Sequence, residues 1–106
     1  MFDALEVSLQ VLEQLAPIEV RIRRKSASLA KQLADASESV SLNLGEGRRR
    51  RAGDQRRHYE MAAGSASEVT TALRIAVSKR YISAADFASV DASLDRVRAM
   101  LFRLTQ

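Results

Sequence analysis

Hydrophobic residues recur along the chain at spacings of three and four residues, and no segment alternates regularly between apolar and polar positions. The first spacing is typical of amphipathic helices, whereas alternation would indicate half-buried strands. The pattern divides into four helices, which we expect at about residues 2–15, 18–46, 55–80 and 84–105. The sequence therefore predicts an all-α protein.

The first predicted helix carries an apolar stripe with heptad spacing, formed by Phe2, Leu5, Leu9, Leu12 and Ala16. Pro17 follows this stripe directly. A proline disfavours the helical conformation of the residue before it, and it suits the first turn of a new helix. We therefore expect a turn near residues 15–17 and a second helix that begins at about residue 18.

The later helix boundaries are predicted from glycines and capping residues. Gly45 and Gly47 are expected to end the second helix, because glycine adopts a positive φ without a Cβ penalty. Asp54 is a good N-cap for the third helix. Ser83 followed by Asp86 resembles a capping box at the start of the fourth helix.

The other three helices also carry regular apolar stripes. The stripe of the second helix consists of Ile18, Ile22, Leu29, Leu33, Ala36, Val40 and Asn43 or Leu44. That of the third consists of Tyr59, Ala62, Ala66, Val69, Leu73, Ala76 and Arg80. That of the fourth consists of Phe87, Val90, Leu94, Val97, Leu101 and Leu104. Four amphipathic helices with short connections predict one domain, residues 1–106, folded as an antiparallel up-down-up-down four-helix bundle.

The predicted helices differ in length, since the first would span about 21 Å and the next two about 40 Å. A short first helix would leave part of the second uncovered. Small residues lie there beside the core stripe, namely Ala30, Ala34, Ser37 and Ser41. Two interpretations are open: these residues are exposed helix formers, or they line a groove that another copy of the chain covers.

Composition excludes several classes of protein. The chain has no cysteine, which excludes a disulfide framework and a thiolate zinc site. No apolar run approaches the roughly 20 residues that a membrane span needs, and the N-terminus lacks the basic region of a secretory signal. We expect a soluble cytoplasmic protein that does not contact membranes.

The net charge of +4 is concentrated in one segment, residues 46–57, where six arginines face two acidic residues. The rest of the chain carries eleven basic and eleven acidic residues. The six arginines are Arg48, Arg49, Arg50, Arg51, Arg56 and Arg57. A basic cluster predicts a polyanionic partner such as nucleic acid. A second basic cluster could extend the same surface and consists of Arg21, Arg23, Arg24 and Lys25.

A structural interpretation explains part of this charge, because the helix dipole favours cations at an exposed helix C-terminus by about 0.3–1 kcal/mol. One or two arginines after the second helix would satisfy that preference, and the run exceeds it. The first hypothesis is therefore nucleic-acid binding, with RNA favoured and with little base stacking, since few aromatic residues accompany the arginines. The alternative is an oligomeric adaptor that docks an acidic protein and has no nucleic-acid role.

Enzyme signatures are absent from the sequence. His58 is the only histidine, which excludes the paired Glu-x-x-His motifs of di-iron bundles. Neither a Gly-x-Ser-x-Gly nucleophile elbow nor a phosphate-binding loop occurs. We therefore expect no catalytic residue, no metal ligand and no cofactor, and we interpret His58 as a surface or interface residue.

Polar residues of the second and third helices suggest a structural role. Asn43 and Glu46 share one helical face, as do Gly64, Ser65 and Glu68 on the next helix. A glycine within a helix costs about 1 kcal/mol relative to alanine and is tolerated where a neighbouring backbone comes close. We expect a polar clasp in which Asn43 or Glu46 bonds Ser65, the loop amides or a following arginine. The alternative is a direct ligand-binding role.

These residues also match the pattern of a known family, Gln-Leu…Ser-x-x-x-Asn-x-x-Glu-Gly…Arg…Ala-x-Gly-Ser-x-x-Glu. The matching residues are Gln32-Leu33, Ser39, Asn43, Glu46-Gly47, the arginine run, Ala62-Ala63-Gly64-Ser65 and Glu68. The sequence resembles the small four-helix-bundle proteins encoded in intervening sequences of bacterial 23S ribosomal RNA genes. A relative of these is the accessory variability determinant of diversity-generating retroelements. Tyr81-Ile82 resembles the family's Gly-Tyr-Ile turn, with Arg80 in place of Gly, and Pro17 fits its first connection.

The resemblance covers essentially the whole chain and implies a ring-shaped homo-oligomer, most often a pentamer, without known catalytic activity. For the retroelement relative it implies that a basic surface binds nucleic acid and a reverse transcriptase. The sequence departs from the family at Gly45, where Ala is usual, and near Val7, where an aromatic residue is frequent. The run of four arginines is richer than the family's usual one or two basic residues, which favours a polyanionic partner.

Overall fold

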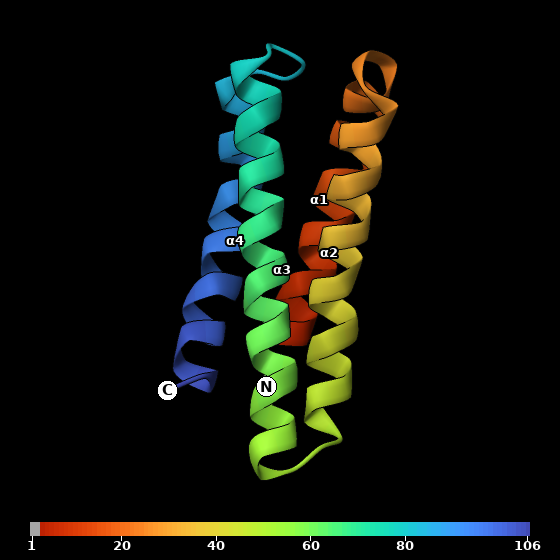
Figure 1. The fold of residues 1–106 in the computed structure, drawn as a ribbon. Coiled ribbons are helices and arrows are strands. Elements are labelled where there is room, and N and C mark those ends of the chain that lie inside the picture. The colour runs from red at the N-terminus through yellow and green to blue at the C-terminus, as the bar shows by residue number, and fades with distance from the viewer. Residues whose placement is uncertain (1–2) are drawn as a thin grey trace.

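The computed structural model describes residues 3–106, which form four helices joined by short connections. These are α1 (Ala4–Lys25), α2 (Ala27–Arg48), α3 (Ala52–Ser78) and α4 (Ala84–Leu104). Consecutive helices run antiparallel, and α1 and α3 each pack against both α2 and α4 (Figure 1). The predicted up-down-up-down bundle is confirmed, and it measures 42 × 24 × 20 Å.

The core runs along the whole bundle, and the predicted stripes of the last three helices supply most of it. The predicted positions from Leu29 onward in α2 are buried, apart from half-buried Asn43, and so are all predicted positions of α3 up to Ala76. In α4 the four central positions are buried, whereas Phe87 is half-buried and Leu104 is 43% exposed. Arg80 is exposed and lies in the α3–α4 connection, so it is not part of the apolar stripe predicted for the third helix.

The predicted turn at Pro17 is wrong, because α1 continues well past this proline. Ile18 and Ile22 continue the buried side of α1, and burial of each contributes about 1.5–3 kcal/mol. Together they offset the cost of about 3 kcal/mol that an internal proline imposes. The chain reverses instead at Ser26, whose N–H donates to the Ile22 carbonyl at 2.7 Å and whose hydroxyl accepts from the Leu29 N–H at 3.1 Å.

The core side of α1 also differs from the predicted stripe. Its buried residues are Ala4, Val7, Ser8, Val11, Leu15, Ile18 and Ile22. Leu5 and Leu12 are only half-buried, Leu9 is 39% exposed and Ala16 is exposed. Phe2 lies outside the described residues. Since α1 and α2 each have 22 residues, the expected mismatch in length between them does not occur.

The small residues of α2 pack against α1 within the same chain. Ala30 is fully buried, Ser37 is 3% exposed and Ala34 is half-buried. The Ser41 hydroxyl lies 2.8 Å from the Ser8 hydroxyl of α1. Neither interpretation proposed for these residues describes Ala30 and Ser37, because a helix of the same chain covers them. Their size lets α1 and α2 approach closely.

The glycines near the end of α2 do not terminate it. Gly45 and Gly47 lie inside the helix, and no glycine of the described chain has a positive φ. Gly47 is buried against the ring of Tyr59 from α3. Because Gly47 has no side chain, α2 and α3 can pack closely at this point. The sequence predicts a helix end here instead.

The starts of the last two helices are set by different caps. Asp54 lies in the first turn of α3 and is not its N-cap, which is Arg51. The capping box of α4 is confirmed, since the Ser83 hydroxyl accepts from the Asp86 N–H at 3.0 Å and the Asp86 carboxylate accepts from the Ser83 N–H at 2.9 Å. Arg80, which precedes this helix, has a φ of 62°. Glycine favours that conformation, which explains why the motif that the sequence resembles has Gly at this position.

Candidate nucleic-acid interface

The ten basic residues that the sequence grouped together lie at opposite ends of the bundle. The six arginines of residues 48–57 flank the α2–α3 connection, and the four basic residues of 21–25 lie in the last turns of α1. A helix of 22 residues separates the two groups, or about 33 Å at 1.5 Å per residue. The prediction that the second basic cluster extends the surface of the first is therefore wrong within one chain.

We name the two ends by what they contain. The arginine-run end comprises residues 3–6, 43–60 and 103–106, and the two-turn end comprises residues 20–30 and 74–86. The two-turn end holds the α1–α2 and α3–α4 connections, which lie together at the top of Figure 1. An up-down-up-down topology places these connections side by side.

Two arginines of residues 46–57 are paired with carboxylates close to them in the sequence. Arg50 donates to Glu46 at 2.9 Å and lies 3.4 Å from Asp54, and Arg57 donates to Asp54 at 2.9 Å. The hydrogen bond from Arg50 holds the pKa of Glu46 below its ordinary value, and that from Arg57 does the same for the pKa of Asp54. Both carboxylates therefore stay charged and neutralise much of the local positive charge.

Two further arginines of residues 46–57 are also paired, one of them with a residue distant in the sequence. Arg56 donates to Glu60 at 2.9 Å, one helical turn further along α3. Arg48 lies 3.4 Å from the carboxylate of Asp3, at the start of α1. The second pair exists only because the antiparallel packing brings the two helix ends together.

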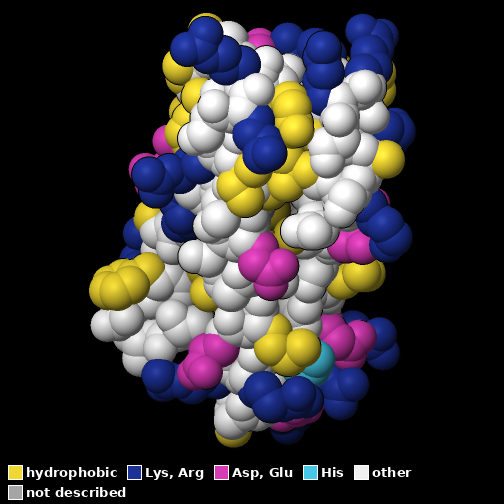
Figure 2. Space-filling model, turned by 45° about the horizontal axis from the view of Figure 1, so that its top comes forward, with side chains coloured by type: hydrophobic (Ala, Val, Ile, Leu, Met, Phe, Trp, Pro, Cys, Tyr) yellow, Lys and Arg dark blue, Asp and Glu magenta, His cyan; other side chains and the backbone are white. Residues whose placement is uncertain are grey.

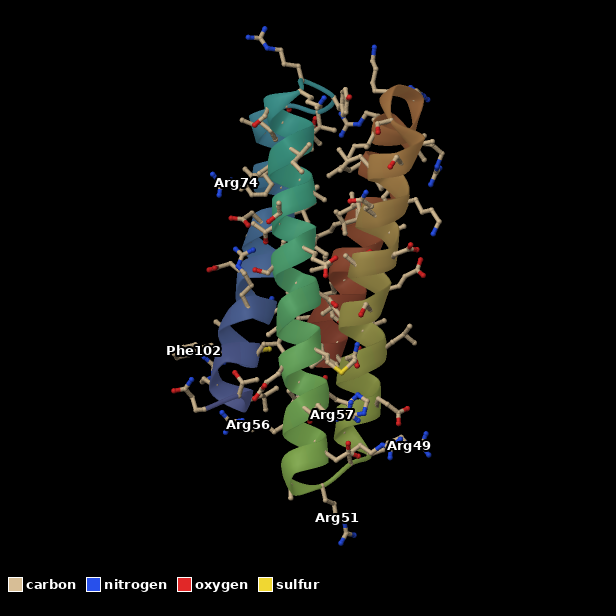
Figure 3. The ribbon with its side chains drawn as sticks, in the orientation of Figure 1. Arg49, Arg51, Arg56, Arg57, Arg74 and Phe102 are labelled. Atoms are coloured by element: carbon tan, nitrogen blue, oxygen red, sulfur yellow. The ribbon has the colours of Figure 1, made fainter. Side chains whose placement is uncertain are left out.

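Arg49, Arg51 and Arg103 are the cations of this end that form no ion pair within 4 Å among residues 3–106. Figure 3 shows the side chains of Arg49 and Arg51 pointing away from the bundle at the α2–α3 connection. Of the six arginines in residues 46–57, two are thus without an ion pair among the described residues and available to a ligand, and Arg103 of α4 adds a third cation.

The charge of the folded chain is distributed differently from the charge along the sequence. The arginine-run end carries seven basic and five acidic residues, whereas the two-turn end carries seven basic residues and one acidic residue. The remaining middle part carries three basic and seven acidic residues. In Figure 2 dark blue side chains gather over the end that faces forward at the top, whereas blue and magenta alternate near the bottom.

The two-turn end includes three basic residues that sequence reasoning did not select: Arg74, Lys79 and Arg80. The predicted topology contained the signal, because the first and third connections of such a bundle lie at the same end. Arg21 is the cation of this end that is paired, since it donates to Asp86 at 2.9 Å. This bond, with hydrogen bonds from Ser83, lowers the pKa of Asp86 from 3.8 to about 2.

The expected polar clasp between α2 and α3 exists. Its predicted bond between Glu46 and a following arginine is present, whereas Asn43 bonds residues other than Ser65. Ser65 donates to the Ser39 hydroxyl at 2.8 Å, and Asn43 donates to the same oxygen at 3.2 Å. The Asn43 amide oxygen lies 3.0 Å from Nδ1 of His58. Glu46 contributes through its bond to Arg50. Sequence reasoning missed Ser39 and His58 as members of the clasp.

Gln55 secures the α2–α3 connection, and sequence reasoning did not select it. Its side-chain amide donates to the carbonyl oxygen of Gly47 at 3.0 Å and to that of Arg50 at 3.2 Å. The Gly47 carbonyl, which also accepts from the Arg50 N–H at 3.1 Å, gains a second bond, and the Arg50 carbonyl beyond the end of α2 gains a partner. A glutamine in the first turn of a helix has no local sequence signal for this role.

The remaining motif residues have no part in the clasp. Gly64 is exposed, and a Cβ there would meet nothing within 4 Å, so the expected close approach of a neighbouring backbone does not occur within the chain. Glu68 is exposed and lines a shallow groove between α2 and α3, together with Gln32, Ser39 and Ser65. Gly64 and Glu68 therefore face solvent in the isolated chain.

Residues 3–106 contain no group of three or more His, Cys, Asp or Glu side chains that is placed to hold a metal ion. None of the helices in this part of the chain combines the length and the apolar character needed to cross a bilayer.

Comparison with solved structures and with protein families places this fold. The fold matches the crystal structure of a Bacteroides thetaiotaomicron protein of unknown function from the S23 ribosomal protein family. The match has a TM-score of 0.90 and 16% sequence identity, and it covers 97% of this chain and 98% of that one. At this identity the match shows the fold alone. Curated protein sequences yield no match. The family model described as 23S rRNA-intervening sequence protein matches residues 3–103, and the chain therefore belongs to that family.

Proposed function

We propose that this protein is a non-enzymatic homo-oligomer that binds nucleic acid through cationic surfaces at the ends of its helical bundle, with RNA as the favoured ligand. The separation of charge along the bundle supports this function best. Both ends carry an excess of basic residues, whereas the middle carries three basic and seven acidic residues. A polyanion is attracted to the ends and repelled by the middle, so it is also oriented by the protein.

The family description supports RNA as the first ligand to test, because it refers to a sequence that interrupts 23S rRNA. Contacts from Lys and Arg to phosphates carry no direct information about base sequence. Binding should therefore depend on the charge and shape of the RNA. It should also weaken steeply as salt rises, because each neutralised phosphate releases counterions.

The outer face of α2 and α3 supports assembly of several copies. Leu42 is 71% exposed, Met61 46% and Ile75 39%, and helical spacing places them beside the groove lined by Glu68. Gly64, which meets nothing in its own chain, leaves room there for a neighbouring helix. A second copy would bury these apolar side chains, and a pentamer is the stoichiometry that the resemblance implies. Several weak cationic surfaces in one particle would act as a multivalent one.

Fluorescence anisotropy with a labelled RNA hairpin, in salt from about 50 to about 200 mM, tests the binding function. We expect saturable binding at low salt and a loss of affinity that is linear in the logarithm of the salt concentration. A DNA duplex of the same sequence tests the preference for RNA, and polyglutamate tests for an acidic protein partner. Absence of RNA binding at the lowest salt would contradict the proposal.

Light scattering coupled to size-exclusion chromatography tests the assembly. The wild type should elute as a particle several times heavier than the 11.7 kDa chain. Gly64→Leu should shift it to the monomer, whereas Gly53→Leu, at another exposed glycine of α3 without neighbours, should not. A monomeric wild type would contradict this part of the proposal.

A further inference from the structure

The two ends of the bundle differ in how much of their positive charge is available to a ligand. We infer that the two-turn end, and not the arginine-run end, is the main surface that takes the phosphate backbone of a nucleic-acid duplex. This inference rests on the proposed function and assigns it to a site. In the sequence, by contrast, the arginine run is the more prominent candidate for the nucleic-acid surface.

Unpaired cations are the first observation. Six of the seven basic residues of the two-turn end form no ion pair within 4 Å among residues 3–106, against three of seven at the arginine-run end. The six are Arg23, Arg24, Lys25, Arg74, Lys79 and Arg80, and all are exposed. An arginine already bonded to a carboxylate must exchange that partner for a phosphate. An unpaired one has only water to displace, so the same contact is stronger.

The helix termini are the second observation. At the arginine-run end the first turns of α1 and α3 carry Glu6 and Asp54, which neutralise the positive ends of those helices. At the two-turn end the first turn of α4 carries Asp86, whereas the first turn of α2 carries no acidic residue, so one of the two helix N-termini there keeps its partial positive charge locally.

The dipole does not account for the cations of the two-turn end. The C-termini of α1 and α3 together carry a charge of about −1, and the N-termini of α2 and α4 carry about +1. These terms cancel over the end as a whole. Seven basic residues against one carboxylate therefore leave a real excess of six positive charges.

The size and surface shape of the two-turn end suit the phosphate backbone of a duplex. The bundle is 24 × 20 Å in cross-section, and 24 Å of duplex presents about 14 phosphates, of which roughly half face one side. Two shallow depressions lie at this end. One is lined by Arg21, Arg80 and Ser83, together with Asp86, the carboxylate that pairs with Arg21. The other is lined by Arg74 and Lys79. Figure 3 shows the Arg74 side chain extending outward from α3 near this end.

Double variants with the same change in charge distinguish the two ends. Each removes two cations that have no ion pair: Lys79→Gln/Arg80→Gly and Arg24→Gln/Lys25→Gln at the two-turn end, and Arg49→Gln/Arg51→Gln at the arginine-run end. Affinity for the RNA hairpin is measured for all three and for the wild type across the salt series. Thermal melting followed by circular dichroism confirms that each variant is folded.

We expect each two-turn variant to bind at least tenfold more weakly than the wild type and to lower the salt slope by about 2, one for each lost phosphate contact. The arginine-run variant should stay within about threefold of the wild type and keep its slope. An equal or larger loss in the arginine-run variant would overturn this inference and leave the proposed function standing. A wild type that binds no RNA at low salt would overturn both.

Discussion

Gly47 of α2 packs directly against the ring of Tyr59 of α3, so closely that a Cβ on Gly47 would lie 2.6 Å from Cε1 and 2.9 Å from Cδ1 of that ring. Both residues are buried near the α2–α3 connection. The contact lets the two helices approach at the point where the clasp and the Gln55 bonds also join them. A requirement for space, and not for backbone freedom, therefore explains this glycine.

Replacement of Gly47 should destabilise the protein although it improves helix propensity. Overpacking against the Tyr59 ring costs about 1–3 kcal/mol, whereas alanine gains at most about 1 kcal/mol over glycine within a helix. Gly47→Ala should therefore lower the free energy of unfolding by up to about 2 kcal/mol, measured by urea denaturation. The matched control is Gly45→Ala, which meets nothing within 4 Å and should stabilise α2 by about 0.5–1 kcal/mol. The same sign for both variants would contradict the packing argument.

Removal of the Asn43 side chain should weaken the clasp. Asn43→Ala leaves half-buried His58 without this partner and removes a donor to Ser39, and a lost hydrogen bond of this kind costs about 1–2 kcal/mol. Hydrogen exchange should accelerate in residues 47–56, which the clasp holds in place. Ser28→Ala, at an exposed position of the same helix, should change stability by less than about 0.5 kcal/mol. Unchanged exchange in Asn43→Ala would show that the clasp does not hold the connection.

The bond between Arg21 and Asp86 should make the two-turn end sensitive to acid. The pKa of Asp86 falls from 3.8 to about 2 in the folded protein. A lowered carboxyl pKa stabilises the fold fully above the unfolded value, and this contribution is lost as pH falls from about 4 to about 2. Carbon-detected NMR titration of the Asp86 carboxyl should show a higher midpoint in Arg21→Gln than in the wild type. Ser83→Ala removes only the side-chain contribution of Ser83, because the backbone N–H at this position still donates to the Asp86 carboxylate, and it should raise the midpoint by less. An unshifted midpoint in Arg21→Gln would contradict the assigned cause.

The left-handed backbone of Arg80 should accept glycine without loss of stability. A non-glycine residue at a φ of 62° is strained by about 1–2 kcal/mol, which exceeds the entropic cost of about 0.5–1 kcal/mol that glycine adds. Arg80→Gly should therefore leave the free energy of unfolding unchanged or raise it by up to about 1 kcal/mol. Arg80→Val, which is β-branched and tolerates this φ poorly, should lower it. A loss of stability in Arg80→Gly would show that the arginine side chain itself stabilises the turn.

The success of sequence reasoning differed among the helices for a physical reason. In α3 and α4 the apolar periodicity agrees with the burial except at the ends of the stripes, at Arg80, Phe87 and Leu104, because no local signal competes with it. In α1 the proline rule at Pro17 competed with the stripe that continues through Ile18 and Ile22, and burial proved stronger. The small residues of α2 posed a different problem. Their spacing predicts that another helix packs closely against α2, but it does not indicate which helix that is.

The candidate site shows the same division. The arginine run is evident in the sequence, but its charge depends on carboxylates that the fold brings to it, as Asp3 does for Arg48. Arg74, Lys79 and Arg80 form no cluster along the sequence. They share one surface with Arg24 and Lys25 because the α1–α2 and α3–α4 connections lie at the same end of the bundle. The signal that could have identified this surface was the predicted topology, combined with the charges near each connection.

The helical class, the number of helices, their antiparallel order and the family can all be read from the amino-acid sequence, because they depend on periodicity and on motifs that lie close together along the chain. The position of the first reversal, the need for Gly47 to lack a side chain and the set of cations without partners become evident only in the folded chain. Those properties depend on contacts between residues far apart in the sequence, such as Gly47 with Tyr59 and Arg48 with Asp3. The energies of burial, packing and ion pairing that arise there outweigh the local preferences from which a sequence is read.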